Sequence, residues 1–460
     1  MTVDGGRFLV IGAGRSGTAA AQALLRRGAD VTVLETGAAP IALVTAKALG
    51  EQGAHMVTDE RSLVPDAVDV VVPSPGVPEH HPLLVAALAA GVAVWSEPEL
   101  AWRLADGRTT LIAVSGTNGK TTTTELLAAC LNAPTAGNIG TPLTGLLADS
   151  PPPLVVAELS SFQLRFAQTL RPHVAVLLNV APDHLDWHGS MAAYRAAKAR
   201  LWARQEPGDT AVTNLDDEGV RQAVFDHPPP AAVLGFTTRA PQAGQVGVAD
   251  GVVVVRRGAA TTQVVAAADL AITGPHNLSN VCAAVAGAVA AGADPAGLGP
   301  ALRAYHAGRH RLESVATVAG VHYVDDSKAT NPHAAAAALS SFPPGRVVWI
   351  AGGLGKGLEF SVLAPLVRRH VKAAVTIGTS GPQIAAVVRG VGVAVTQAVT
   401  LDVAVEAAAG LAAPGDTVLL APACASMDQF TNYAERGQVF RAAVEALPNG
   451  RRTQGVAGGR

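Results

Sequence analysis

Short apolar runs alternate with helix-like stretches along most of the chain. The run at residues 7–11 is followed by a helical pattern at 18–27 and by a second apolar run at 30–34. Strand-like runs that alternate with amphipathic helices are typical of parallel sheets whose faces are covered by helices. We therefore predict an α/β fold built from several such alternating segments.

The same pattern predicts the elements of three successive segments. In the first segment, strands are expected at 68–72 and 92–95 and a helix at 83–90. In the second, strands are expected at 111–114, 154–157, 174–180, 209–215, 231–236 and 252–255, and helices at 123–131 and 277–292. In the third, strands are expected at 321–324, 347–351, 373–377, 393–395 and 417–421, and helices at 332–341, 360–369, 382–389, 402–411 and 434–447. The third segment reads as a parallel sheet with helices on both faces.

Length and composition divide this pattern into domains. A chain of 460 residues, 49% of them hydrophobic and 15% charged, is too long for one ordinary core but can bury several. We predict domains at 1–98, 99–307 and 308–449 and a disordered tail at 450–460. The net charge of -2 gives no overall basic footprint for nucleic acid. Three scattered cysteines, no export signal and no apolar stretch long enough to span a bilayer predict a cytoplasmic protein without membrane insertion.

The strongest candidate for chemistry is the stretch Gly-Thr-Asn-Gly-Lys-Thr-Thr at 116–122, between an apolar run and a helix. A glycine turn that opens a helix presents backbone N–H groups and the positive end of the helix dipole to a phosphate. Lys120 would add a positive charge at the β- and γ-phosphates, and the Thr121 hydroxyl is placed to bind Mg²⁺. This stretch predicts an ATP site.

A second glycine turn, Gly-Ala-Gly-Arg-Ser-Gly at 12–17, follows the first strand, and Glu35 ends the next strand. This is the arrangement of a dinucleotide-binding fold, in which the acid binds a ribose. The turn itself indicates only a site for a pyrophosphate group at a helix N-terminus, so it could bind a UDP-sugar as well as NAD.

Polar residues also follow other predicted strands. Glu158 ends the strand that begins at Leu154, and because ligands lie beyond the carboxyl ends of parallel strands, Glu158 and Thr121 should meet there. His184 lies just beyond the next strand. Lys198 shares a helix face with two aromatic residues, and spacing alone predicts a partly covered surface lysine. In the third segment, three of the predicted strands are each followed by a cluster of polar residues, and these clusters lie at 325–331, 352–356 and 422–428.

With these residues placed, the sequence resembles the Mur ligase family of ATP-dependent amide-bond formers over essentially its whole length up to the tail. The most telling stretches are 116–122, 158–163, 179–186, 326–331 and 422–430. The last two resemble the branch that adds D-glutamate to UDP-N-acetylmuramoyl-L-alanine. The resemblance implies three domains: a Rossmann-like UDP-binding N-terminal domain, a central P-loop ATPase-type domain and a Rossmann-like C-terminal domain.

The resemblance also implies roles for individual residues. On the ATP side it implies Gly116, Thr117, Asn118, Gly119, Lys120, Thr121, Thr122, Asn277, Arg311 and Asp326. For the UDP substrate it implies Gly14, Arg15, Ser16, Glu35, Thr36, Ser74, Asn138 and His184. For D-glutamate it implies Lys328, Thr330, Lys356, Ser426 and Tyr433, and for metal Thr121, Glu158, His184 and Lys198. Lys120, His184 and Lys198 would act in catalysis.

The implied reaction activates the substrate's alanyl carboxylate as an acyl phosphate, which the amine of D-glutamate then attacks in peptidoglycan precursor synthesis. The implied cofactors are ATP, two Mg²⁺ ions and a CO₂-derived carbamate on Lys198, and the expected state is a monomer that acts on small molecules. Three alternatives stay open at this point: a folylpolyglutamate-type ligase, a nucleotide-dependent oxidoreductase built on the 12–17 turn, and an NTP-binding switch without synthesis.

Overall fold

The computed structural model describes residues 3–37, 40–59 and 67–448, so the predicted tail at 450–460 lies outside the described residues. The chain forms two compact units. The first comprises Met1–Val180, Trp187–Leu270 and Ser279–Ala304, and the second Ala181–Asp186, Ala271–Leu278 and Tyr305–Arg460. Two short segments from the middle of the sequence therefore belong to the C-terminal unit.

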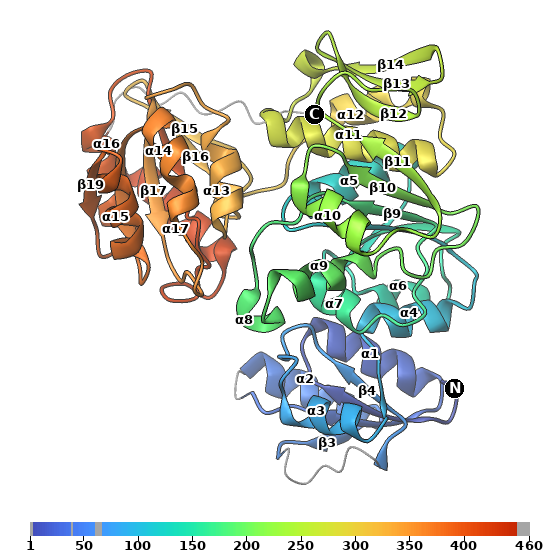
Figure 1. Cartoon of the computed structure of the whole chain (residues 1–460). Coiled ribbons are helices and arrows are strands. Elements are labelled where there is room, and N and C mark those ends of the chain that lie inside the picture. The colour runs from blue at the N-terminus through green and yellow to red at the C-terminus, as the bar shows by residue number, and fades with distance from the viewer. Residues whose placement is uncertain (1–2, 38–39, 60–66, 449–460) are drawn as a thin grey trace. The chain divides into compact units, whose positions relative to one another are not determined.

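The N-terminal part of the first unit, drawn in blue in Figure 1, is a five-stranded parallel sheet in the order β3-β2-β1-β4-β5. Its central strands are apolar along their length because helices cover both faces of such a sheet. The strands are β1 Arg7–Ile11, β2 Asp30–Leu34, β3 His55–Val57, β4 Val70–Pro73 and β5 Ala93–Val94, and the helices are α1 Arg15–Arg26, α2 Pro40–Glu51 and α3 Pro82–Ala89.

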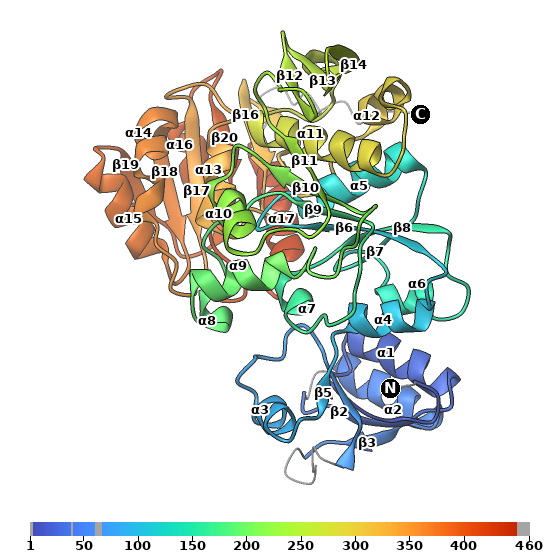
Figure 2. The same ribbon diagram turned by 45° about the vertical axis from the view of Figure 1, so that its right-hand side comes forward.

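Helix α4, Glu97–Ala105, follows this sheet and was not predicted. The predicted end of the first domain, residue 98, lies within α4, because a proline in the first turn of a helix is compatible with helical geometry. Ser96 caps the helix by accepting from the Glu99 N–H. Helix α4 lies beside α6, Leu143–Leu147, in both whole-chain views (Figures 1 and 2).

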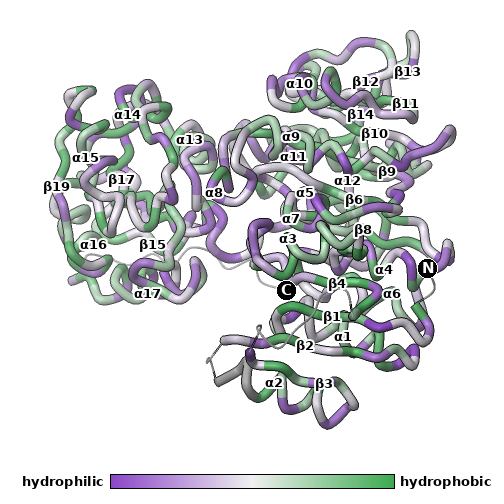
Figure 3. The backbone as a smooth tube through the Cα atoms, turned by 60° about the horizontal axis from the view of Figure 1, so that its bottom comes forward, coloured by the Kyte–Doolittle hydropathy of each residue, from purple (hydrophilic) through white to green (hydrophobic). Residues whose placement is uncertain are grey.

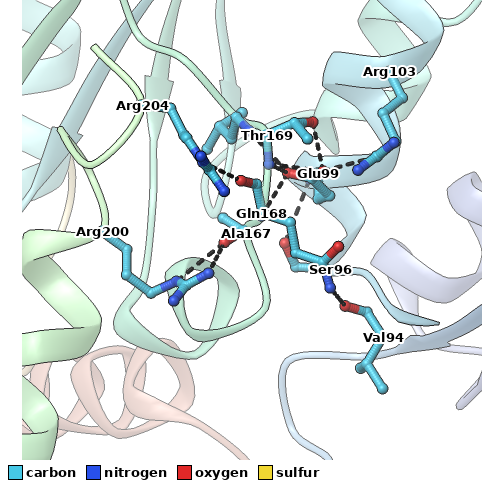
Figure 4. Close-up of polar contacts among 10 residues, drawn as sticks. Val94, Ser96, Glu99, Arg103, Ala167, Gln168, Thr169, Arg200 and Arg204 are labelled. Atoms are coloured by element: carbon cyan, nitrogen blue, oxygen red, sulfur yellow. Dashed lines mark hydrogen bonds and ion pairs between the residues drawn. The ribbon is translucent and has the colours of Figure 1, made fainter. Parts of the chain in front are cut away.

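The buried carboxylate of Glu99 joins α4 to the loop at residues 168–170 (Figure 4). Its oxygens accept from all three backbone N–H groups of that loop at 2.8 to 3.0 Å, from the Thr169 hydroxyl and from the Arg103 guanidinium. The Gln168 side chain donates in turn to the Val94 carbonyl of β5. Because charge-assisted bonds surround the carboxylate, it can be buried without an unsatisfied charge.

The rest of the first unit is built on a nine-stranded sheet in the order β14-β13-β12-β11-β10-β9-β6-β8-β7. The strands from β7 to β12 run parallel, whereas β12, β13 and β14 form antiparallel pairs, of which only β13 was predicted. The strands are β6 Thr110–Ser115, β7 Thr135–Gly137, β8 Leu154–Glu158, β9 Val174–Leu177, β10 Thr210–Asn214, β11 Ala232–Phe236, β12 Gln245–Ala249, β13 Val252–Arg257 and β14 Ala260–Ala266.

The helices of this stretch are mostly short. They are α5 Lys120–Leu131, α6, α7 Ser161–Arg165, α8 Leu185–His188, α9 Met191–Ala199, α10 Glu218–Asp226, α11 Pro275–Ala290 and α12 Gly299–Ala304, with 3₁₀ turns at Ala267–Asp269 and Pro295–Gly297. Ser190 caps α9, since its hydroxyl accepts from the Ala193 N–H. Of the two aromatic residues expected to share a helix face with Lys198, Tyr194 lies on α9, whereas Trp202 lies beyond its end.

The second unit contains a six-stranded sheet in the order β15-β16-β20-β17-β18-β19. The five predicted strands of this sheet pair in parallel as expected, and an additional edge strand that was not predicted, β15, pairs antiparallel with β16. Only Val315 and Val318 are buried in strand β15, so it lacks the continuous apolar run of the central strands. The strands are β15 Glu313–Val318, β16 Val321–Asp325, β17 Val347–Gly352, β18 Val371–Ile377, β19 Ala394–Gln397 and β20 Thr417–Leu420. The helices are α13 Pro332–Leu339, α14 Ala364–His370, α15 Gly381–Gly390, α16 Leu401–Leu411 and α17 Tyr433–Ala446, with a 3₁₀ turn at Ser361–Leu363.

Apolar strands supply the core of each sheet. In Figure 3, β1 and β4 lie side by side and are largely green, and their side chains are buried except for that of Arg7. The described part of the chain contains no helix that is both long enough and apolar enough to cross a membrane. The predicted α/β class is confirmed, with three separate sheets.

Glu97, in the first turn of α4, is a second buried carboxylate at this junction. Its Oε1 accepts from the Thr144 N–H and hydroxyl at 2.5 and 2.7 Å, and its Oε2 has no hydrogen-bond partner among the described residues. Burial raises the pKa of Glu97 from 4.5 to about 7, although the bonds from Thr144 oppose the shift. The folded protein therefore binds this proton more tightly than the unfolded chain does.

We expect Glu97→Gln to change how stability depends on pH. In the wild type, this site contributes less stability as pH rises from 4.5 to 7, because the unfolded chain loses its proton over this range while the folded protein still holds its own. The shift corresponds to roughly 3 kcal/mol. The free energy of unfolding of the variant minus that of the wild type, measured in urea, should be larger at pH 8 than at pH 5. The exposed Glu51→Gln is the control, and an equal difference at both pH values would contradict the assignment.

Candidate functional site

The phosphate-loop candidate has the predicted strand, turn and helix geometry. Strand β6 ends at Ser115, and α5 begins at Lys120, whose ammonium folds back to donate to the Gly116 and Thr117 carbonyls at 2.9 Å each. Gly119 has a positive φ of 81°, and a Cβ there would lie 2.3 Å from the Asn280 Oδ1 on α11. Glycine is therefore required at the position where the loop turns into the helix.

Asn179, to which the sequence analysis gave no role, holds this loop from the end of the neighbouring strand. Its side-chain oxygen accepts from the Asn118 N–H at 2.8 Å, its amide donates to the Asn118 carbonyl at 3.0 Å, and its own carbonyl accepts from the Thr117 N–H. Two sequence signals could have indicated it: Asn179 lies just beyond β9, which pairs with β6, and it begins the stretch 179–186 that resembles the Mur ligase family.

Thr121 and Glu158 meet, as the sequence predicted. The Thr121 hydroxyl donates to Glu158 Oε2 at 2.6 Å, and the Asn138 amide donates to Glu158 Oε1 at 2.7 Å. The meeting follows from register, because β8 lies between β6 and β7, and Glu158 pairs with Val114 on one side and Gly137 on the other. A carboxylate and a hydroxyl beside a phosphate loop are oxygen ligands of the kind that Mg²⁺ prefers.

Lys198 is buried, not partly covered at the surface as spacing alone suggested. Its side chain is 1% exposed, and its Nζ donates to the Gly116 carbonyl at 2.8 Å and lies 4.6 Å from the centre of the Tyr194 ring. The Tyr194 hydroxyl lies 3.1 Å from the Thr117 hydroxyl. The Gly116 carbonyl oxygen thus accepts from both Lys120 and Lys198, which places two ammonium groups side by side.

The first glycine turn, at residues 12–17, is stabilised by hydrogen bonds with Glu35 and Ser74. Glu35 Oε2 accepts from the Ala13 N–H at 2.6 Å and its Oε1 from the Gly37 N–H at 2.7 Å, so both oxygens of this acid bind backbone. Ser74 donates to the Gly12 carbonyl at 3.1 Å. Arg15 donates to the Gly140 carbonyl, next to the turn that carries Asn138, and so links the first sheet to the second.

In the second unit, a cavity of about 220 Å³ brings together all five residues that the family resemblance implies for D-glutamate. They come from the loops after β16, β17 and β20 and from the start of α17, and the Lys328 ammonium lies 3.9 Å from the centre of the Tyr433 ring. His184 also lines this cavity, from the segment Ala181–Asp186. The full lining is Asp183, His184, Lys328, Thr330, Leu354, Gly355, Lys356, Leu358, Ala425, Ser426, Met427, Thr431, Asn432 and Tyr433.

The remaining ATP-side candidates, Asn277, Arg311 and Asp326, also belong to the second unit. Burial raises the pKa of Asp326 to about 7, while the bond from the Leu312 N–H and the charge of Arg311 oppose the rise. Asn277 donates to the Thr273 carbonyl at 2.8 Å in the first turn of α11. Of the four metal candidates, Thr121, Glu158 and Lys198 belong to the first unit and His184 to the second.

Arg436 is a further residue that the sequence did not single out. It is 1% exposed, and its guanidinium donates to the Ser327 hydroxyl and carbonyl and to the Cys424 carbonyl at 2.8 to 3.1 Å. It therefore ties the loop that carries Lys328 to the loop that carries Ser426. Burial lowers the pKa of Arg436 to about 10.

Comparison with known proteins finds one family model for the region of each of the three sheets. Residues 6–96 match the model of the Mur ligase MurD-like N-terminal domain, 114–288 the Mur ligase middle domain, and 310–424 the Mur ligase glutamate ligase domain. The chain is thus a three-domain ligase by class. It belongs to the Mur ligase family, whose members use ATP.

Two similar relatives are both named UDP-N-acetylmuramoylalanine–D-glutamate ligase. The protein from Frankia casuarinae is 49% identical over 95% of this chain and 93% of its own length. The protein from Thermobifida fusca is 43% identical over 97% of this chain and 100% of its own.

Solved structures share the fold at lower identity. The UDP-N-acetylmuramate–alanine ligase of Thermotoga maritima has a TM-score of 0.58 at 18% identity and covers 96% of this chain and 100% of its own. The MurF ligase of Thermotoga maritima, solved in complex with ADP, has a TM-score of 0.59 at 16% identity over 90% of this chain and 95% of its own.

We expect Lys120→Ala to lower ATP turnover on the order of 10²–10³-fold, because the variant loses the cation at the start of α5. Steady-state phosphate release measures the effect, and thermal melting checks that the variant is folded. Thr124→Val on the same helix is the control, since the buried Thr124 hydroxyl has no hydrogen-bond partner among the described residues. A turnover of Lys120→Ala equal to that of the control would contradict the phosphate-loop assignment.

Proposed function

We propose that the chain joins D-glutamate to UDP-N-acetylmuramoyl-L-alanine in an ATP-driven step of peptidoglycan precursor synthesis that releases ADP and phosphate. The observation that carries this proposal is the cavity of the second unit, where Lys328 and Lys356 stand with two hydroxyl residues, Thr330 and Ser426. Two ammonium groups and hydroxyl donors suit an amino acid with two carboxylates. Relatives similar over nearly the whole chain carry the name of this ligase.

The first step transfers the γ-phosphate of ATP to the alanyl carboxylate of the UDP substrate, which makes an acyl phosphate. Both reactants are anions, so the step needs positive charge, and Lys120 and the N–H groups at the start of α5 supply it. Bound Mg²⁺ would supply further charge neutralisation, with Thr121 and Glu158 as ligands of one ion and His184 and Lys198 as ligands of a second.

A carbamate on Lys198 fits the surroundings of its amine. As an ammonium, Lys198 shares the Gly116 carbonyl with Lys120, so two like charges lie close together in a buried place. Carbamylation by CO₂ removes that repulsion, leaves one N–H to donate to Gly116, and adds an anion that can bind metal. Lys120 would then keep its charge for the phosphates.

In the second step, the D-glutamate amine attacks the acyl phosphate, and phosphate leaves from the tetrahedral intermediate. Lys328, Thr330, Lys356, Ser426 and Tyr433 orient the amino acid. Asn277, Arg311 and Asp326 contact ATP, together with the 116–122 loop.

The UDP substrate binds the first sheet through Gly14, Arg15, Ser16, Glu35, Thr36 and Ser74, and Asn138 and His184 contact its muramoyl part. We assign these roles to domains at 1–98, 99–307 and 308–449 of a monomer. Because ATP and UDP-sugars are cytoplasmic metabolites, we place the enzyme in the cytoplasm.

The test is phosphate release from ATP and Mg²⁺ in the presence of UDP-N-acetylmuramoyl-L-alanine, with D-glutamate, L-glutamate or D-alanine added in turn. We expect release to require both the UDP substrate and D-glutamate, because the acyl phosphate forms on one and is consumed by the other. Release that is indifferent to the amino acid would refute the proposal and favour a nucleotide-binding switch.

Lys198→Ala tests the carbamate separately. We expect its kcat to fall on the order of 100-fold, since an anionic ligand near the phosphates is lost. Short-chain carboxylates added to the assay should restore part of the rate by occupying the vacated space. Lys47→Ala, which removes an exposed lysine, is the control and should respond to neither change. Wild-type activity of Lys198→Ala without any additive would rule the carbamate out.

A further inference from the structure

The segment Ala181–Asp186 follows β9 of the nine-stranded sheet, yet it belongs to the second unit. Within that unit, Asp183 Oδ2 accepts from the Asn331 side-chain amide at 2.9 Å. Asn331 ends the loop that carries Lys328 and Thr330. One hydrogen bond therefore joins the segment that carries His184 to the loop of the proposed amino-acid site.

Asn331 is suited to this contact because its side-chain oxygen and nitrogen make two different hydrogen bonds. It is 2% exposed and caps helix α13, where its Oδ1 accepts from the Ala334 N–H at 2.9 Å. Capping fixes which way the carboxamide faces, and its Nδ2 then points to Asp183. Aspartate would cap equally well, but it has no donor for Asp183.

Asp183 in turn fixes its neighbour. Its Oδ1 accepts from the His184 N–H at 3.0 Å, and its Oδ2 lies 3.7 Å from His184 Nε2. His184 has a φ of 54°, a left-handed conformation that costs a non-glycine residue about 1–2 kcal/mol. Such a conformation persists only where surrounding contacts impose it, and the Asp183 carboxylate supplies contacts on both the backbone and the ring side.

We propose that Asn331 is a positioning residue. Its hydrogen bond to Asp183 fixes the Asp183 carboxylate, which in turn keeps His184 in its left-handed conformation at the wall of the amino-acid cavity. Binding of the amino acid by Lys328 and Thr330 is then coupled to the placement of His184, because Asn331 closes the same loop. This inference rests on the role that the proposed function gives to His184.

The experiment is a reciprocal exchange. Asn331→Asp keeps the helix cap but sets two carboxylates against each other. Asp183→Asn leaves one side-chain oxygen for two donors, so when this oxygen accepts from the His184 N–H, an NH₂ group faces the Asn331 NH₂ group. The double variant Asp183→Asn/Asn331→Asp restores one donor and one acceptor in reversed order. We expect each single variant to lower kcat/KM for D-glutamate about tenfold and the double variant to recover to within threefold of wild type.

Hydrogen exchange provides a readout that does not depend on activity. The amides of residues 181–186 should exchange about tenfold faster in Asn331→Asp than in the wild type and should return toward wild-type exchange in the double variant. Asn331→Ser, which caps the helix but is too short to reach Asp183, should speed exchange without adding a charge. Thermal melting verifies that all four variants are folded.

The outcomes separate this inference from the proposed function. Unchanged exchange in Asn331→Asp would show that the bond does not hold the segment, and faster exchange with wild-type kinetics would show that holding it does not position His184. Either result overturns the inference. Full activity of His184→Ala would instead refute the role of His184 in the proposed function, whatever the exchange rates are.

Discussion

The parallel register of β7, β8, β6 and β9 is the constraint on which the first candidate site depends. Glu158 can accept from Thr121 and Asn138 only because β8 lies between the strands that lead to those residues. The same register brings Asn179, at the end of β9, against the phosphate loop. Since parallel strands end at one edge of a sheet, separate stretches of sequence supply a single polar site.

The second candidate site depends on loops that a buried arginine holds together. Its side chains come from loops after β16, β17 and β20, and a buried cation, Arg436, joins two of these loops through carbonyl oxygens. Gly437, next to it, must be glycine, because a Cβ would lie 2.1 Å from His310 Nδ1. Helix α17 therefore packs directly against the strand ends that carry the polar residues.

Elements with a continuous apolar run and a glycine or proline at their ends could be read from the sequence, and β1, β2, β6 and β17 are found close to their predicted bounds. Among the elements that were not predicted, β12, β14 and β15 lack such a run, and α4 carries a proline in its first turn, where proline is compatible with a helix.

Some contacts of the candidate sites could likewise be predicted from the sequence, and others could not. Geometry could be predicted where it follows from two strands of one parallel sheet that end at the same edge, as for Thr121 and Glu158. The burial of Lys198 and the contacts of Asn179 and Arg436 join residues far apart in sequence, so spacing along one helix or strand could not reveal them.

The chain enters the second unit three times, at Ala181–Asp186, at Ala271–Leu278 and finally at Tyr305. The C-terminal unit is therefore not a contiguous stretch of the gene. A fragment that starts at Tyr305 would leave Asn331 without Asp183 and would lack one wall of its own cavity. Recombination between relatives within residues 187–270 or 279–304 would likewise separate His184 from the loops beside it, so those loops and the 181–186 segment should be inherited together.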